Sequence, residues 1–124
     1  MPRALIVDDD DGVRHLIKSL LENVKIDADE AKDGLEGMQF IKRNKYDIVF
    51  LDVKMPRLNG EQFMGILKKR DEKCPVIVVS GHLIKEQIPT FIKLGVKGFL
   101  SKPLSLKTFY EEVNKICPIE IPKA

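Results

Sequence analysis

Residues 4–11 read ALIVDDDD, and this stretch decides the fold. A continuous apolar run rich in Val and Ile is typical of a parallel strand covered on both faces. The run stops at four aspartates, so it predicts a buried strand with a strongly acidic end. Runs of similar length and composition occur at 48–51, 76–79 and 96–100.

Helical patterns lie between these runs. Apolar residues recur every three or four positions in 13–24 and in 106–117, as expected for helices that bury one face. Shorter stripes with the same spacing occupy 35–41 and 63–67. The segment 26–31 alternates acidic and apolar residues, which predicts a half-exposed edge strand.

The segment 83–94 is harder to interpret, because Pro89 falls inside its apolar pattern. An interior proline removes a backbone hydrogen bond and clashes with the preceding turn. Two structures are compatible with it: a helix kinked at Pro89, or a helix that begins late with Pro89 in its first turn. With this segment included, strand and helix alternate five times. The alternation predicts one three-layer α/β domain with a parallel sheet and helices on both faces.

Length and charge exclude several classes of protein. The 124 residues suffice for one domain with a sound core and are too few for two. A net charge of +2 lacks the basic excess of a general nucleic-acid binder, and the lysines are scattered along the chain. No apolar run approaches the roughly 18 residues of a membrane helix, and the first run is too short for a signal peptide. We therefore expect Cys74 and Cys117 to be free thiols in a reducing cytoplasm, since two distant cysteines cannot form a zinc site.

The residues that follow each strand indicate the function, because ligands of open α/β sheets bind beyond the carboxyl ends of the strands. Asp8 and Asp9 follow the first run, and Asp52 follows 48–51. If these two strands are neighbours, the three carboxylates converge, and their repulsion requires a compensating cation. An all-oxygen site suits magnesium, which keeps several waters and leaves room for phosphate oxygens. Ser80 and Lys102 follow later strands, and Lys102 supplies a second positive charge.

Other readings of the same residues have to be weighed. Asp10 and Asp11 are expected to serve as the cap and first-turn acids of the next helix. The four aspartates argue against a flavodoxin-type cofactor, because they repel a phosphate-bearing ligand in the absence of metal, and no glycine-rich phosphate loop is present. A magnesium-dependent phosphatase with an aspartate nucleophile stays open as an alternative. Such hydrolases normally carry a second acid two residues after the nucleophile, where this chain has Lys54.

Four motifs together resemble the receiver domain of response regulators over roughly residues 3–117. The resemblance implies a flavodoxin-like receiver fold, in which a five-stranded parallel sheet has the order 2-1-3-4-5. It also implies a receiver domain over 1–117 and a C-terminal tail over 118–124. The motifs are LIVDDDDGVR at 5–14, DIVFLDVKMPRLNG at 47–60, VIVVSG at 76–81 and GFLSKP at 98–103.

The resemblance implies a role for each acidic residue of the site. Asp52 resembles the phosphoacceptor of the family. Asp9 and Asp52 look like direct ligands of Mg²⁺ or Mn²⁺, with the main-chain carbonyl of Lys54 as a third ligand. Asp8 is expected to act mainly through water. Lys102 is similar to the lysine that pairs with the phosphoryl group.

Further residues match the positions that switch and time the signal. Ser80 matches the hydroxyl residue that follows the phosphoryl oxygen, and Phe99 matches the switch aromatic, without the hydroxyl of a tyrosine. Lys54 and His82 occupy the positions that modulate the lifetime of the phosphoryl group in the family.

The peptide bond between Lys102 and Pro103 is expected to be cis, as is usual in the family. Only about 5–6% of ordinary bonds before proline are cis, so this is a specific structural prediction.

The resemblance implies a phosphorylation-dependent signalling switch of a two-component system rather than an enzyme. A sensor histidine kinase or a histidine phosphotransfer protein would donate the phosphoryl group, as would a small donor such as acetyl phosphate. An output protein would bind the face built from the fourth helix, fifth strand and fifth helix, without direct contact with nucleic acid or membrane. Two alternatives stay open: a degenerate receiver that binds partners constitutively, and a fragment of a longer regulator, since only seven residues follow Cys117.

Overall fold

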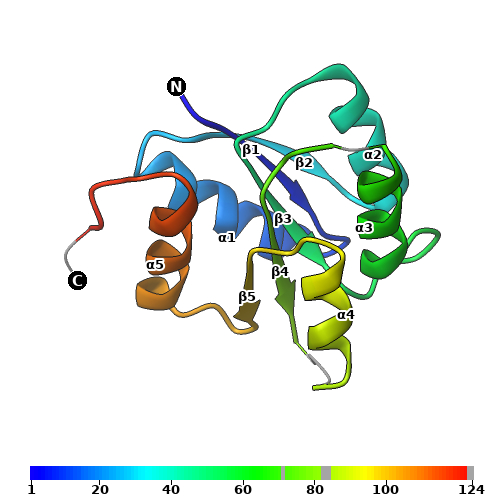
Figure 1. Cartoon of the computed structure of the whole chain (residues 1–124). Coiled ribbons are helices and arrows are strands. Elements are labelled where there is room, and N and C mark those ends of the chain that lie inside the picture. The colour runs from blue at the N-terminus through cyan, green and yellow to red at the C-terminus, as the bar shows by residue number, and fades with distance from the viewer. Residues whose placement is uncertain (71, 82–84, 123–124) are drawn as a thin grey trace.

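Five parallel strands form one sheet in the order β2-β1-β3-β4-β5, as the resemblance implied (Figure 1). The structure is a computed structural model that describes residues 1–70, 72–81 and 85–122. Its strands are β1 (Arg3–Val7), β2 (Asp27–Ala31), β3 (Ile48–Asp52), β4 (Val76–Ser80) and β5 (Gly98–Ser101). β3 lies at the centre and is buried along its whole length, which is why its sequence is apolar on both faces.

The helices form two layers, one on each face of the sheet. Helices α1 (Asp11–Glu22) and α5 (Leu106–Ile116) cover one face. The other face is covered by α2 (Gly34–Arg43), α3 (Gly60–Lys69) and α4 (Gln87–Lys93). The predicted three-layer α/β architecture is therefore confirmed.

Alternate side chains of each strand enter different cores. Ile48 and Phe50 of β3 pack against α1 and α5, and the ring of Phe50 stacks on that of Phe109 with centroids 5.4 Å apart. Val49 and Leu51 enter the core beneath α2, α3 and α4. Because successive strand side chains point to opposite faces, two separate apolar cores hold the central strand in place.

Most element boundaries agree with the sequence pattern, and β5 shows a difference. The apolar run begins at Val96, whereas the strand begins at Gly98. The amide of Val96 donates to the carbonyl of Phe91 and thereby closes the end of α4, while the amide of Lys97 makes the first bond to Val76. Val96 is thus buried as part of the turn that precedes the strand.

Helix α4 settles the two alternatives at Pro89. The helix begins at Gln87, so Pro89 lies in its first turn, where the missing amide hydrogen costs no helical hydrogen bond. The earlier part of the predicted segment, at 83–84, lies outside the described residues.

Other local predictions are also confirmed. β2 lies at an edge of the sheet and is half-exposed. The carboxylate of Asp10 caps α1 by accepting hydrogen bonds from the amides of Gly12 and Val13. Cys74 and Cys117 are free thiols, the first half-buried and the second buried. Within the described part of the chain, every helix is too short or too polar to span a membrane.

Candidate functional site

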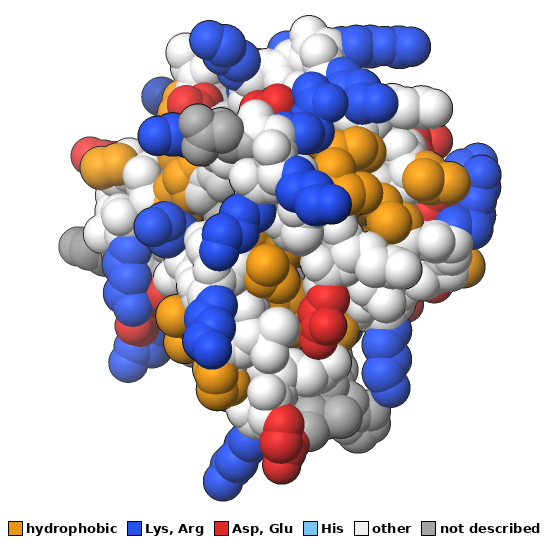
Figure 2. All heavy atoms as spheres, turned by 45° about the vertical axis from the view of Figure 1, so that its right-hand side comes forward, with side chains coloured by type: hydrophobic (Ala, Val, Ile, Leu, Met, Phe, Trp, Pro, Cys, Tyr) orange, Lys and Arg blue, Asp and Glu red, His pale blue; other side chains and the backbone are white. Residues whose placement is uncertain are grey.

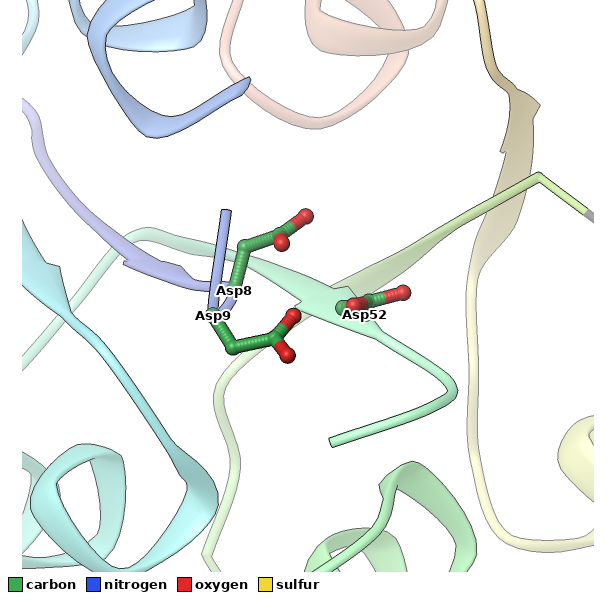
Figure 3. A group of neighbouring side chains, drawn as sticks. All are labelled: Asp8, Asp9 and Asp52. Carbon is green, nitrogen blue, oxygen red and sulfur yellow. The ribbon is translucent and has the colours of Figure 1, made fainter. Parts of the chain in front are cut away.

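Three carboxylates meet at the carboxyl edge of the sheet. β1 and β3 are hydrogen-bonded neighbours with Val7 opposite Leu51. The residues that follow these two, Asp8 and Asp52, therefore lie at the same edge of the sheet. Carboxylate oxygens of Asp8, Asp9 and Asp52 all lie within 4.8 Å of one another. In Figure 3 the side chains of Asp8 and Asp9 extend from the end of β1 toward Asp52. The convergence predicted from the strand order is therefore confirmed.

Burial makes this cluster electrostatically unfavourable. The exposed fractions of Asp8 and Asp52 are only 2% and 6%, whereas Asp9 is open to solvent. Burial, together with the charges of Asp8 and Asp9, raises the pKa of Asp52 to about 6, although the charge of Lys102 opposes the rise. The ionised form of Asp52 is thus disfavoured, and a nearby positive charge stabilises it.

Lys102 provides part of that charge. Its ammonium group lies 3.0 Å from Oδ2 of Asp8 and 3.5 Å from Oδ1 of Asp52. Burial alone would lower the pKa of Lys102, but its contacts with the two carboxylates raise it above the ordinary value. The lysine therefore stays charged and bridges the two buried acids. Its peptide bond to Pro103 is cis, as predicted.

The donor set fits a divalent cation. Oδ1 of Asp8 accepts a hydrogen bond from the amide of Asp10 at 2.9 Å. Among the described residues, Oδ2 of Asp8 is buried and accepts no hydrogen bond of normal geometry, so its nearest compensation is the charge of Lys102. A buried oxygen without a hydrogen bond, in a cluster of oxygen ligands, is what a hard cation such as Mg²⁺ would satisfy.

A cavity of about 540 Å³ opens beside the carboxylates. Asp9 and Lys54 line it, together with Asn59 and Gln87 from the beginnings of α3 and α4. The side chain of Lys54 is exposed. The cavity wall beside the cluster thus combines a lysine with the exposed carboxylate of Asp9.

The two predicted switch residues lie on neighbouring strands. Ser80 is the buried last residue of β4, and its carbonyl accepts a hydrogen bond from the amide of Lys102. Phe99 on β5 pairs with Val78 and is half-buried, with its ring edge-on to Phe91 of α4 at 6.4 Å.

The predicted lifetime position at His82 lies outside the described residues. The roles assigned to the Lys54 carbonyl and to the two switch residues stay predictions, because static geometry does not test them.

Arg14 is a site residue that the sequence reasoning missed. It is 9% exposed, and its guanidinium donates to the carbonyl of Asp8 at 2.7 Å and to Glu30 at 3.3 Å. It also pairs with Asp11. The signal was available, because Arg14 precedes Ile17 by three residues and therefore lies on the buried face of α1. The arginine anchors the backbone that carries the acidic cluster.

The loop after Asp52 is held by two further contacts. A Cβ atom at Gly60 would lie 3.0 Å from the carbonyl oxygen of Asp52 and 3.0 Å from Cα of Val53, so a side chain there would force this backbone to shift by a few tenths of an ångström. Arg57 has a left-handed backbone (φ 73°), and its guanidinium lies 3.3 Å from Asp33, the N-cap of α2. Both contacts fix the loop that carries Lys54.

Comparison with known proteins agrees with this geometry. A family model described as the response regulator receiver domain matches residues 4–114. The chain is 31% identical to chemotaxis protein CheY-3 of Vibrio cholerae over 117 residues, which cover 92% of this chain and 90% of that protein. It is 27% identical to transcription factor SKN7 of Candida albicans over 111 residues, but spans only 20% of its length.

Solved structures show the same relationship. The receiver domain of the Francisella response regulator 1452 superimposes with a TM-score of 0.86 at 34% identity, covering 94% of this chain and 96% of that one. CheY4 of Vibrio cholerae superimposes with a TM-score of 0.87 at 22% identity over 94% of this chain and 98% of that one, which supports the fold alone.

Proposed function

The chain belongs to the response regulator receiver domain family, and on this premise we propose that it is a phosphorylation-dependent switch of a two-component system. Receiver domains are signalling switches rather than classical enzymes. In this proposal Asp52 is the phosphoacceptor, residues 1–117 are the receiver unit and 118–124 are a tail. The observation that carries the proposal is the contact of Lys102 with two of three converging carboxylates.

Asp52 is the residue suited to attack phosphorus. Its pKa of about 6 leaves it ionised at neutral pH, and burial makes its charge costly. An Asp52 oxygen forms a bond to the phosphorus of the donor, while the bond from phosphorus to the imidazole nitrogen of a phosphohistidine breaks. The product is an acyl phosphate. Positioning and charge neutralisation supply the catalysis.

The positive charges around Asp52 would stabilise the transferred group. In the proposal Asp9, Asp52 and the main-chain carbonyl of Lys54 hold Mg²⁺ or Mn²⁺, and Asp8 contributes mainly through water. A bound ion supplies charge that neutralises the phosphoryl oxygens. Lys102 releases its contact with Asp52 and pairs with the new phosphoryl group, which would form on the carboxylate that the ammonium already contacts.

The signal would leave the site through two side chains. Ser80 turns to donate a hydrogen bond to the phosphoryl group, and Phe99 moves into the space that Ser80 vacates. Because Phe99 contacts Phe91 of α4, its movement changes the α4-β5-α5 face that we propose as the output surface. Lys54 and His82 are proposed to set the lifetime of the acyl phosphate before water removes it.

The proposed partners follow from this chemistry. The donor is a sensor histidine kinase or a histidine phosphotransfer protein in the cytoplasm, and the output partner is a protein. A chemotaxis protein and a transcription factor both occur among the relatives, so relatives of this chain serve different kinds of output.

Incubation with acetyl phosphate and Mg²⁺, followed by intact-protein mass spectrometry, tests the proposal. We expect a single phosphoryl adduct on the wild type and none on Asp52→Asn. Lys32→Ala, an exposed lysine outside the site, serves as a control that keeps the adduct. An adduct that persists in Asp52→Asn contradicts the assignment. Absence of any adduct favours a constitutive binding module, and turnover of p-nitrophenyl phosphate favours a phosphatase.

A further inference from the structure

Basic side chains gather at the edge of the sheet where the strands begin, which is opposite to the edge that carries Asp52. The last turns of α2 and α3 carry Lys42, Arg43, Lys68 and Lys69, and the last turn of α4 carries Lys93. In the space-filling view, Lys and Arg dominate this side of the molecule, and hydrophobic side chains are exposed between them (Figure 2). The lysines that are scattered in the sequence are therefore gathered in space, because parallel strands bring successive helix ends to one edge.

Helix-end stabilisation accounts for only part of this charge. A basic residue in a last turn complements the helix dipole and stabilises the helix by about 0.3–1 kcal/mol. Lys45, Lys73 and Lys97 lie beyond the ends of their helices and are exposed. Within the described part of the chain, these three lysines form no ion pair, whereas Arg70 pairs with Glu72 at 3.4 Å. The charges of these loop lysines are thus open to solvent.

The same edge is hollowed. One cavity of about 700 Å³ lies between the end of α2 and the α3–β4 loop, and a second of about 370 Å³ lies between that loop and the end of α4. Glu72, Lys73 and Cys74 line both, so the two cavities form one groove. Leu67, Pro75 and Leu94 line its second half. The groove therefore combines an apolar floor with a rim on which basic residues outnumber the acidic Asp47 and Glu72.

We propose that this groove docks an acidic segment of a partner protein. Carboxylates of the segment would face Lys73 and Lys97, and an apolar side chain would cover Leu67 and Leu94. The apolar floor favours a peptide over nucleic acid. Surfaces that bind single-stranded nucleic acid combine basic side chains with exposed aromatic rings on which the bases stack. The aromatic residue described in this groove, Tyr46, is buried.

Docking here is independent of the phosphorylation site. Ile48 and Asp52 lie at opposite ends of β3, about 13 Å apart at roughly 3.3 Å per residue. A partner in the groove leaves Asp52 and its cavity open to a phosphoryl donor. The groove would therefore keep the protein bound to its partner in both the phosphorylated and the unphosphorylated state. This property goes beyond the proposed phosphorylation switch.

Fluorescence anisotropy with a labelled peptide of repeating Glu-Glu-Leu tests this inference. We expect saturable binding that weakens with salt, and that weakens about tenfold in Lys73→Glu/Lys97→Glu, equivalent to about 1.4 kcal/mol. Lys32→Glu/Lys107→Glu makes the same change of charge at exposed positions outside the groove, and should bind nearly as well as the wild type. A peptide with Gln in place of Glu should not bind. Circular dichroism verifies that each variant is folded.

The remaining outcomes are equally decisive. Unchanged peptide binding by Asp52→Asn supports docking independent of phosphorylation, and the adduct assay tests the switch separately. No saturable binding, or equal weakening in both double variants, overturns the proposal. Tighter binding to a DNA duplex than to the peptide, lost in Lys73→Glu/Lys97→Glu, overturns it in favour of a nucleic-acid surface.

Discussion

At the residue scale, Asp52 shows how a functional group can oppose the stability of its own fold. It lies at the end of a buried strand beside two other carboxylates, and its pKa of about 6 lies above the ordinary value of 3.8. The folded protein thus holds the Asp52 proton more tightly than the unfolded chain does. Ionised Asp52 therefore destabilises the metal-free fold above pH 6, and this cost disappears as the pH falls from 6 toward 4.

Replacing Asp52 with Asn should stabilise the metal-free protein at pH 7.5. One pKa unit corresponds to about 1.4 kcal/mol, and solvent screening reduces the effect, so we expect a gain of about 1–2 kcal/mol. Urea unfolding in EDTA at pH 7.5 and at pH 4 measures the difference. The gain should largely vanish at pH 4, and a variant that is less stable than the wild type at pH 7.5 contradicts the argument.

Arg14 should influence metal affinity without being a ligand. Its guanidinium contacts the carbonyl of Asp8 and the carboxylates of Asp11 and Glu30, a fork that lysine cannot reproduce. Outer groups that orient ligands typically contribute about 10–100-fold to metal affinity. We expect Arg14→Lys to weaken Mg²⁺ binding by about tenfold in calorimetric titration.

Arg3→Lys is the matched control for this experiment. Arg3 begins β1 at the opposite end from Asp8 and pairs with Asp29. Its replacement should leave Mg²⁺ affinity unchanged. Equal losses in both variants would show that the effect is a general loss of stability rather than the positioning of Asp8.

At the scale of the element, α3 begins in contact with the backbone of the site. Its N-terminus is held by a capping box between Asn59 and Gln62, and the amide of Gly60 donates to the carbonyl of Val53 at 2.9 Å. Gly60 permits this approach because a Cβ there would press on Asp52 and Val53. A second glycine in the helix, Gly65, has open space around it. One helix thus contains a required glycine and a replaceable one.

The two glycines of α3 predict opposite effects of alanine. Gly65→Ala should raise the free energy of unfolding by about 0.5–1 kcal/mol, because alanine favours the helix. Gly60→Ala should lower it by about 1–3 kcal/mol, since it forces the loop after Asp52 to move. It should also slow formation of the acetyl phosphate adduct. Chemical denaturation of both variants measures the signs, and a stabilised Gly60→Ala protein contradicts the close contact.

At the scale of the whole molecule, the near-neutral total charge conceals an acidic edge and a basic edge at opposite ends of the strands. The carboxyl edge carries the buried aspartates, and the amino edge carries the lysines of the groove. Roughly 13 Å of strand separates them, and the groove lysines are exposed, so salt with a Debye length of about 8 Å at physiological ionic strength screens much of their field at the aspartates. The two edges should therefore act nearly independently in the cell.

This separation predicts a small effect of the groove on the metal site. Lys73→Glu/Lys97→Glu should change the Kd for Mg²⁺ by less than about twofold at physiological salt. The effect should grow at low ionic strength, where screening is weak. Calorimetric titration at both ionic strengths measures it. A tenfold change at physiological salt would mean that the two edges are coupled through the fold rather than separated.

Patterns local in the sequence already determined much of this protein. Runs of buried apolar residues define β1, β3 and β4, because a strand covered on both faces needs apolar side chains on both. The placement of Asp8 and Asp52 at the ends of two such runs predicted their convergence on condition that the two strands are neighbours, an order that the family resemblance implied. The cis bond before Pro103 followed from the family resemblance. These features depend on neighbours along the chain or on the general topology of parallel sheets.

Tertiary structure alone decided the features that depend on distances between distant residues. The ammonium of Lys102 bridges Asp8 and Asp52, and Arg14 reaches the Asp8 carbonyl. Helical spacing indicates that Arg14 is buried, but it does not specify which group the arginine contacts. The late start of α4 was one of two structures that Pro89 allows. The basic groove forms from helix ends that lie far apart in the chain. The sequence therefore determines which residues follow each strand, whereas packing of the helices on the sheet determines which charges meet.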